Sequence, residues 1–132
     1  MVNTAALIAL YEATGGATWT KNDGWLNTTL GAQHWHGVGF GTNGFLYLRN
    51  NNLRGTLPTE FGKIGSFGSN MAWTLDDNQI SGTLPVSLGD LSNGGNAQMF
   101  LGANHFSGTL PTEVRSQRSN PGPRQQEATA HI

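Results

Sequence analysis

The sequence predicts an α/β solenoid: a short right-handed superhelix with a parallel β-sheet on its concave face and a helical cap at its N-terminus. The first observation is an eight-residue phrase that occurs at residues 51–58, 78–85 and 104–111. Its first Asn advances by 27 and then by 26 positions, a period typical of stacked repeats. The second observation is a pair of apolar residues, two positions apart, before each phrase. The third is an opening segment with the pattern of one helix followed by a cluster of tryptophans.

Residues 1–44 form the predicted cap. A helix is expected over residues 3–14, because apolar side chains recur there at helical spacing and Asn3 or Thr4 can cap the first turn. Gly15-Gly16 ends this helix. The irregular segment after it holds three of the four tryptophans, Trp19, Trp25 and Trp35. Several large aromatic side chains close together in the sequence are typical of a segment that covers the apolar end of a solenoid.

A short strand is predicted at the end of the cap, where Val38 and Phe40 alternate with glycine. Asn43-Gly44 is a strong tight-turn signal. We therefore expect the next strand to begin at Phe45.

Residues 45–114 are predicted to form three coils, each made of a short strand, a turn and a return path. Period-2 alternation turns one pair of each strand toward the core: Leu46 and Leu48, Trp73 and Leu75, and Met99 and Leu101. The strands should stack as a parallel ladder about 4.8 Å apart. The Asn at each turn is expected to bond the backbone of its own and the neighbouring coil, which gives a structural ladder of Asn51, Asn78 and Asn104.

Residues 115–132 are predicted to be a disordered tail, because they are polar, include Pro121-Gly122-Pro123 and cannot bury enough apolar surface. The third coil also has Gln117 where the first two have Ile64 and Leu91. The strand of the third coil is therefore an open edge, which either the tail or another chain must cover.

The composition excludes several classes of function. The net charge is −1 and only 11% of the residues are charged, so no electrostatic surface for nucleic acid is expected. The chain has no cysteine, which excludes disulfides, thiolate metal sites and thiol nucleophiles. The longest apolar run, residues 5–10, is much too short to cross a bilayer and lacks the flanks of a secretory signal. Membrane insertion is therefore not expected.

The repeats resemble those of the plant-type leucine-rich repeat family, whose pattern is apolar-x-apolar-x-x-Asn-x-apolar-x-Gly-x-apolar-Pro. Residues 46–58, 73–85 and 99–111 agree with that pattern position by position. The opening is similar to the N-terminal cap of the family, with a short helix followed by Thr14-Gly15-Gly16, Trp19, Gly24-Trp25-Leu26 and Trp35-His36-Gly37-Val38. The two cysteines usual in that cap are replaced by Gln33 and Phe40.

The resemblance implies a non-enzymatic recognition module that binds a protein or peptide, or a glycan, through its concave sheet. It also implies an extracellular or cell-surface protein. The absence of cysteines and of a signal peptide favours instead an intracellular chain or a processed fragment, so the compartment stays open. No cofactor is expected.

The predicted ligand site is the concave face, made by the residues that alternate with the inward pairs. Its candidate residues are Phe45, Tyr47, Arg49, Thr74, Asp76, Gln98 and Phe100. Tyr47 and Phe100 fall in one column, separated by Thr74 and so roughly 10 Å apart, where exposed rings can anchor a protein or stack on a sugar. The alternative is that these rings pack against each other or against the tail. Arg49 and Asp76 lie opposite each other on neighbouring strands and are expected to form an ion pair.

Two other functions stay open. The chain can be a structural subunit that docks on a partner chain through its uncapped C-terminal end. It can also bind ice through a column of threonines on another face, Thr56, Thr83 and Thr109.

No metal site and no catalytic site is predicted. His34 and His36 alternate as two metal ligands do, but no third ligand is evident, and a structural role in the cap is favoured. Asp76-Asp77 lacks further carboxylates at the spacing of a calcium loop. No nucleophile, base and oxyanion group come together in the pattern, so an enzyme is not expected.

Overall fold

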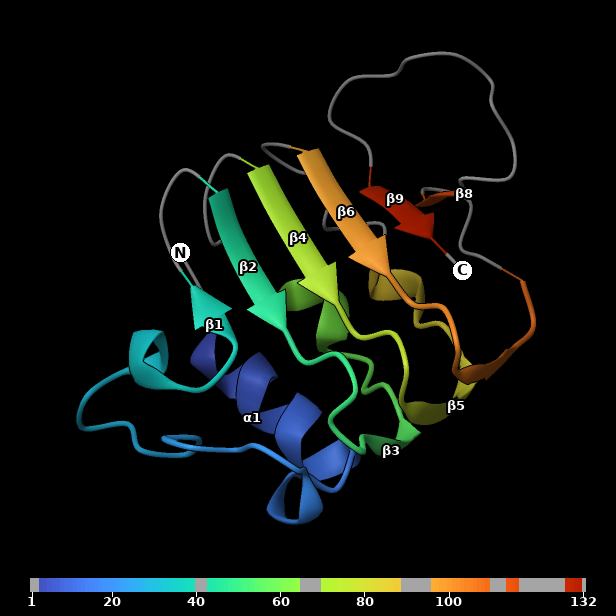
Figure 1. Ribbon diagram of the computed structural model, residues 1–132. Helices are drawn as coiled ribbons and strands as arrows, with labels where there is room; N and C mark the ends of the chain where they lie inside the picture. The colour runs from blue at the N-terminus through green and yellow to red at the C-terminus, as the bar shows by residue number, and fades with distance from the viewer. Residues whose placement is uncertain are drawn as a thin grey trace.

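The computed structural model of the chain describes residues 3–39, 43–64, 70–88, 96–109, 114–116 and 128–131. The strands of the larger sheet are β1 (Val38–Gly39), β2 (Asn43–Tyr47), β4 (Asn70–Thr74), β6 (Asn96–Phe100), β8 (Val114–Ser116) and β9 (Ala128–His131). Those of the smaller sheet are β3 (Arg54–Thr56), β5 (Gln79–Thr83) and β7 (His105–Ser107). The larger sheet has the strand order β1-β2-β4-β6-β9-β8 and the smaller sheet the order β3-β5-β7. Figure 1 shows the resulting stack of coils, which is the predicted solenoid.

The N-terminal helix α1 (Thr4–Ala13) forms as the sequence predicts. The side chain of Asn3 accepts a hydrogen bond of 3.2 Å from an amide of the first turn, which satisfies one of the free donors there. After Thr14 the chain turns at Gly15, whose φ of 71° is left-handed, and enters the short 3-10 turn η1 (Gly16–Thr18). Helix α1 lies on one side of the larger sheet (Figure 1).

The tryptophans of the cap form an aromatic cluster against α1. The ring of Trp25 lies 4.9 Å from the rings of both Trp19 and Trp35, and Tyr11 of α1 stacks on it at 5.8 Å. The three indole N–H groups donate to backbone carbonyls, those of Thr14, His36 and Asn27. Because each ring buries its apolar surface and its N–H is paired, the cluster closes the core without an unpaired polar group.

The boundary between the cap and the first coil differs from the predicted one. Strand β2 begins at Asn43 and not at Phe45, so that Asn43-Gly44 lies inside the strand and forms no tight turn. The first two residues of β2 pair in parallel with the first two residues of β4. This pairing with the next coil overrides the local turn propensity of Asn-Gly. The predicted strand before β2 is β1, which pairs antiparallel with β2. Phe40, which was expected to belong to that strand, lies outside the described residues.

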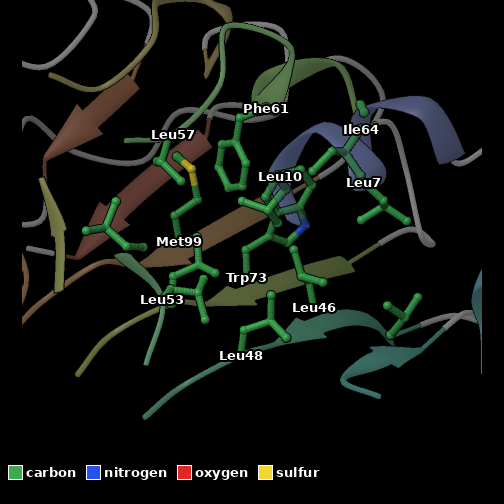
Figure 2. Close-up of a cluster of buried hydrophobic side chains, with 14 of the residues drawn as sticks. Leu7, Leu10, Leu46, Leu48, Leu53, Leu57, Phe61, Ile64, Trp73 and Met99 are labelled. Atoms are coloured by element: carbon green, nitrogen blue, oxygen red, sulfur yellow. The ribbon is translucent and has the colours of Figure 1, made fainter. Parts of the chain in front are cut away.

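Strands β2, β4 and β6 stack in register, so equivalent residues of the three coils lie side by side. The inward row Leu46, Trp73 and Met99 is fully buried, and so is the row Leu48, Leu75 and Leu101. Both rows belong to one core. Figure 2 shows Leu46, Leu48, Trp73 and Met99 of these rows with residues of the return path and of α1: Leu7, Leu10, Leu53, Leu57, Phe61 and Ile64. The rings of Phe61 and Trp73 meet edge to face at 5.1 Å. The predicted continuous apolar rows are confirmed.

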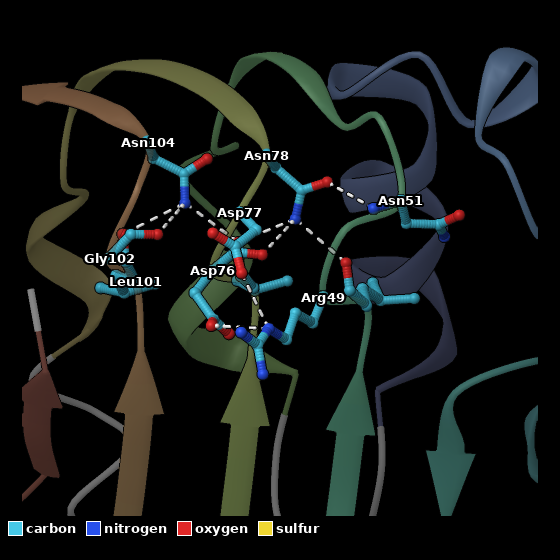
Figure 3. Close-up of polar contacts among 10 residues, drawn as sticks. Arg49, Asn51, Asp76, Asp77, Asn78, Leu101, Gly102 and Asn104 are labelled. Carbon is cyan, nitrogen blue, oxygen red and sulfur yellow. Dashed lines mark hydrogen bonds and ion pairs between the residues drawn. The ribbon is translucent and has the colours of Figure 1, made fainter.

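A buried asparagine ties the second coil to the first. The side-chain oxygen of Asn78 accepts from the backbone N–H of Asn51 at 2.9 Å and of Leu53 at 3.0 Å. Its amide nitrogen donates to the carbonyls of Leu48, in the first coil, and Leu75, in its own coil, at 3.0 and 2.8 Å (Figure 3). One carboxamide therefore satisfies turn groups of two coils at once.

The same bridge recurs at both neighbouring turns. The side-chain oxygen of Asn104 accepts from the amide of Ile80, and its amide nitrogen donates to Leu75 of the preceding coil. Asn51 extends the ladder into the cap, because its side chain accepts from the amide of Lys21 at 2.6 Å and donates to the carbonyl of the same residue at 2.8 Å. The side chains of Asn51, Asn78 and Asn104 thus form a ladder of hydrogen bonds that reaches into the cap.

Left-handed glycines allow the coils to approach each other at the smaller sheet. Gly55 and Gly82 have φ angles of 84° and 82°. A Cβ atom on Gly55 would lie 2.5 Å from the carbonyl oxygen of Ala13 at the end of α1. On Gly82 it would lie 2.8 Å from the methyl group of Thr56 in the preceding coil. Side chains at these two positions would force the coils apart.

The three threonines of the predicted column are exposed, but their rungs are offset. The register of the smaller sheet places Thr56 beside Ser81 and Thr83 beside Ser107. Thr109 is also exposed and lies beyond the end of β7. Neighbouring strands therefore pair threonine with serine at this face.

The end of the chain differs from the prediction of a disordered tail. Residues 128–131 form β9, which pairs in parallel with β6 from Ala97↔Ala128 to Phe100↔His131. Strand β8 then pairs in parallel with the outer edge of β9. The backbone of β9 thus takes the place of a fourth rung, and the edge of the third coil is covered by the chain itself. Backbone pairing with an open edge needs no apolar side chains, which is why the polar composition does not reveal it.

One residue of each turn, immediately before the ladder asparagine, adopts a left-handed conformation. Asn50, Asp77 and Ala103 have φ angles of 52°, 57° and 53°. Asn and Asp tolerate this region because their side chains bond locally, whereas an alanine there is strained.

We expect Asn78→Ala to lower the free energy of unfolding by about 3–5 kcal/mol, because it leaves several buried backbone groups of two coils without partners. Gln79→Ala is the matched control, since Gln79 is the exposed next residue, and it should change stability by less than about 0.5 kcal/mol. Chemical denaturation of the two variants checks this. Equal stabilities would contradict the role of the ladder.

Ala103→Gly should raise the free energy of unfolding by about 0.5–1 kcal/mol, because it removes the strain of a left-handed alanine. The matched control Ala9→Gly, in the middle of α1, should have the opposite sign and cost about 1 kcal/mol. Thermal unfolding of both variants tests the prediction. A loss of stability in both would show that Ala103 is not strained.

Candidate functional site

The concave face is the side of the larger sheet that bears the side chains alternating with the inward rows. No described helix lies on this side, which faces the viewer in Figure 1. Phe45, Tyr47 and Phe100 are 44%, 50% and 37% exposed, although they belong to the same strands as fully buried residues. Tyr47, Thr74 and Phe100 are aligned across β2, β4 and β6. The predicted column therefore exists, with a ring at each end and a small residue between them.

The ring of Phe45 is positioned by the cap strand. A Cβ atom on Gly39 of β1 would lie 2.1 Å from this ring, so Phe45 rests on the bare backbone of the neighbouring strand. Its other face remains open to solvent. Tyr47, two residues further along β2, is more exposed and lies next to the end of the strand.

Arg49 is held by two carboxylates of the next coil. Its Nε atom lies 3.1 Å from Oδ2 of Asp76 and donates a hydrogen bond of 2.8 Å to Oδ2 of Asp77 (Figure 3). The hydrogen bond to Asp77 raises the pKa of the guanidinium, and the charges of Asp76 and Asp77 raise it further. The Arg49 side chain is 51% exposed, so both contacts are open to solvent and fix its direction more than they add stability.

The predicted pair of Arg49 with Asp76 is present, and Asp77 is the partner that the sequence did not reveal. In a regular strand Asp77 would point away from the concave face. Its left-handed φ of 57° breaks the alternation and brings its carboxylate to the same side as Asp76. The sequence signal for this turn is a residue type that tolerates the left-handed conformation, Asn50 and Asp77, before the ladder asparagine of the first two coils.

A hollow of about 550 Å³ lies where the end of β2 meets the cap. We refer to it as the cap hollow. Its walls are Thr20, Lys21, His36, Tyr47, Leu48, Arg49, Asn50, Asn51 and Asp77. The volume is within the range of small-ligand pockets. It brings an aromatic ring, cationic side chains and one carboxylate to a single opening.

Three residues of the cap hollow, Thr20, Lys21 and His36, come from the cap, which sequence reasoning did not connect with the concave face. Lys21 is placed by the ladder, because Asn51 bonds both its N–H and its carbonyl. His36 is placed by the aromatic cluster, since its carbonyl accepts from the indole of Trp25. Both placements depend on how the cap folds back on the first coil, and no local pattern encodes that.

The predicted site residues are not all brought to one place. Tyr47 and Arg49 line the cap hollow, and Phe45 lies beside Tyr47 on β2. Gln98 and Phe100 belong to β6, two strands away, and both make contacts within the structure. The cap hollow therefore gathers the site residues at the end of β2, and those of β6 lie apart from it.

Among the described residues, no group of three or more His, Asp and Glu side chains is arranged to hold a metal ion. His34 is exposed and His36 lines the cap hollow. In the part of the chain that the structure covers, no helix has the length and apolar character needed to span a bilayer.

Comparison with known proteins gives two likenesses. The Leucine Rich Repeat family matches residues 45–64, which contain the first coil. The crystal structure of PEPR1–AtPEP1 superposes with a TM-score of 0.53 at 18% sequence identity. The superposition covers 86% of this chain but only 15% of that chain, so this chain spans a small part of its length. The search of curated proteins gives no match. At residues 45–64 the chain is therefore similar to the Leucine Rich Repeat family, and over most of its length it is similar in fold to the chain of the PEPR1–AtPEP1 structure.

Proposed function

We propose that the chain is a non-enzymatic recognition module that binds a protein or peptide through its concave face. The observation that carries the proposal is the combination at the end of β2: the exposed ring of Tyr47, the guanidinium of Arg49 held by two carboxylates, and the cap hollow beside them. Aromatic and Arg side chains in partly enclosed positions supply most of the affinity in protein interfaces.

Rigidity supports this role. The backbone of β2 is paired with strands on both sides, and the turn after it is fixed by the asparagine ladder. Side chains on such elements lose little freedom when a partner binds, which favours affinity. The likeness to PEPR1–AtPEP1 supports a protein or peptide partner in general terms, and the face and residues named here are our inference.

A glycan ligand remains a second candidate, because an exposed ring can stack on the apolar face of a sugar. The cap hollow favours a peptide, since its walls combine Lys21 and Arg49 with the carboxylate of Asp77. Such mixed charge suits the side chains and backbone of a polypeptide better than the uncharged hydroxyls of a simple sugar.

The two other functions have less support. Strand β9 covers the edge of β6 that a partner chain would need for docking at the C-terminal end. The offset rungs of the smaller sheet pair Thr56 with Ser81, so a uniform threonine array for ice is missing from its strand pairs.

The test uses peptides selected from a random display library for binding to the full chain. Tyr47→Ala should weaken the selected binders by at least about tenfold, the loss typical of a central aromatic anchor. Arg49→Gln should weaken the binding of those selected peptides whose hydrogen-bond acceptor groups point into the cap hollow. Titration calorimetry measures each affinity, and circular dichroism confirms that the variants are folded.

Val86→Ala is the matched control, because Val86 is 83% exposed and follows β5, outside the concave face. It should leave the affinities unchanged. Binders that survive Tyr47→Ala and Arg49→Gln but are lost with Val86→Ala would refute the proposed face. If the full chain binds sugars and no peptide of the library, the ligand is a glycan and not a peptide.

A further inference from the structure

The cap contains a triplet that neither the repeat pattern nor the concave face explains. Asn27-Thr28-Thr29 has the form Asn-x-Thr, the acceptor pattern for N-linked glycosylation, and the sequence holds it once. A sequence match of this kind is weak by itself. The structure decides whether the asparagine is accessible and whether its amide group is available.

The triplet lies in an exposed turn. Asn27, Thr28 and Thr29 are all exposed, between the buried Trp25 and the 3-10 turn η2 (Ala32–His34). The segment belongs to the cap, at the N-terminal end of the stack near α1 (Figure 1). A bulky modification there would not have to displace any packed element.

The backbone of Asn27 is fixed while its side chain points outward. Its N–H donates to the carbonyl of Gly24 at 3.1 Å, and its carbonyl accepts from the indole of Trp35 at 3.0 Å. Both bonds anchor the turn to the aromatic cluster of the cap. The position of the side chain is therefore set by the folded cap and is not that of a loose loop.

The side chain itself has the arrangement that the acceptor pattern needs. Its Oδ1 accepts a hydrogen bond of 3.1 Å from the backbone N–H of Thr29. The carbonyl end of the carboxamide is thus engaged by the third residue of the triplet, and no described residue accepts a hydrogen bond from Nδ2. A bond from the side chain of an asparagine to the backbone two residues on is the usual local turn of this residue type.

We propose that Asn27 is an acceptor for an N-linked oligosaccharide. The donor is an oligosaccharide on a polyprenyl pyrophosphate, used by a membrane-bound transferase. The amide nitrogen Nδ2 of Asn27 attacks the anomeric carbon, a nitrogen–carbon bond forms, and the bond from that carbon to the pyrophosphate oxygen breaks. Polyprenyl pyrophosphate leaves with the electron pair, and one amide proton passes to a base of the transferase.

Two exposed apolar side chains flank the triplet. Leu26 and Leu30 are 44% and 56% exposed, and Leu26 also has a left-handed φ of 71°. A glycan on Asn27 would lie next to them. The proposal does not depend on the function of the concave face.

The test expresses the full chain behind a cleavable secretory leader in eukaryotic cells. The unsubstituted chain should migrate more slowly than its form treated with peptide N-glycosidase, and that enzyme should convert Asn27 to Asp, which mass spectrometry of the peptide locates. Asn27→Gln and Thr29→Ala should remove the shift completely. Thr29→Ser should keep it, because the hydroxyl remains.

Thr28→Ala is the matched control, since it changes an exposed threonine of the same turn and leaves the acceptor pattern intact. It should keep the shift. If the chain is retained in the cell, the same assay is done on the leader-processed chain in the microsomal lumen. Leader-processed chain that carries no sugar on Asn27, in the medium or in the lumen, would overturn the proposal.

Discussion

The structure depends on the carboxamide of one asparagine per turn, which is buried in the first two turns and partly buried in the third. Asn78 and Asn104 each bond the backbone of their own coil and of the preceding coil, as Asn78 does toward Leu75 and Leu48. Asn51 bonds Lys21 of the cap in the same way. A hydrophobic contact between coils is tolerant of small shifts, whereas these bonds have a fixed length and direction. The ladder therefore sets the register of the coils, and the apolar rows of the core follow that register.

The register in turn determines what the concave face presents. Because β2, β4 and β6 are aligned, each exposed position forms a row across the sheet. Asn51 carries the same constraint into the cap through Lys21, and this contact forms one wall of the cap hollow. The left-handed residue before each ladder asparagine completes the turn, and in the second coil it supplies Asp77 to Arg49.

The sequence predicts the repeated part of this fold well, because the signal recurs. The inward rows, the ladder and the column of Tyr47 and Phe100 each follow from residues that repeat with the coil, so one pattern is tested three times. What occurs once is harder to predict. The cap hollow depends on how an irregular segment folds. The contact of Asp77 with Arg49 depends on a break in the strand alternation. The pairing of β9 with β6 is made by backbone groups, so the residue types do not indicate it. Tertiary pairing also overrides the local turn signal of Asn43-Gly44.

Native-state hydrogen exchange of the amides held by the ladder tests the central role of the asparagines most directly. The N–H groups of Leu53 and Ile80 donate to the side chains of Asn78 and Asn104, in two successive turns. If the ladder couples the coils, both amides exchange with one common free energy that equals the free energy of global unfolding at every denaturant concentration. Exchange of the Ile80 amide through a separate opening of much lower free energy, while the Leu53 amide stays protected, would contradict the coupling of one coil to the next.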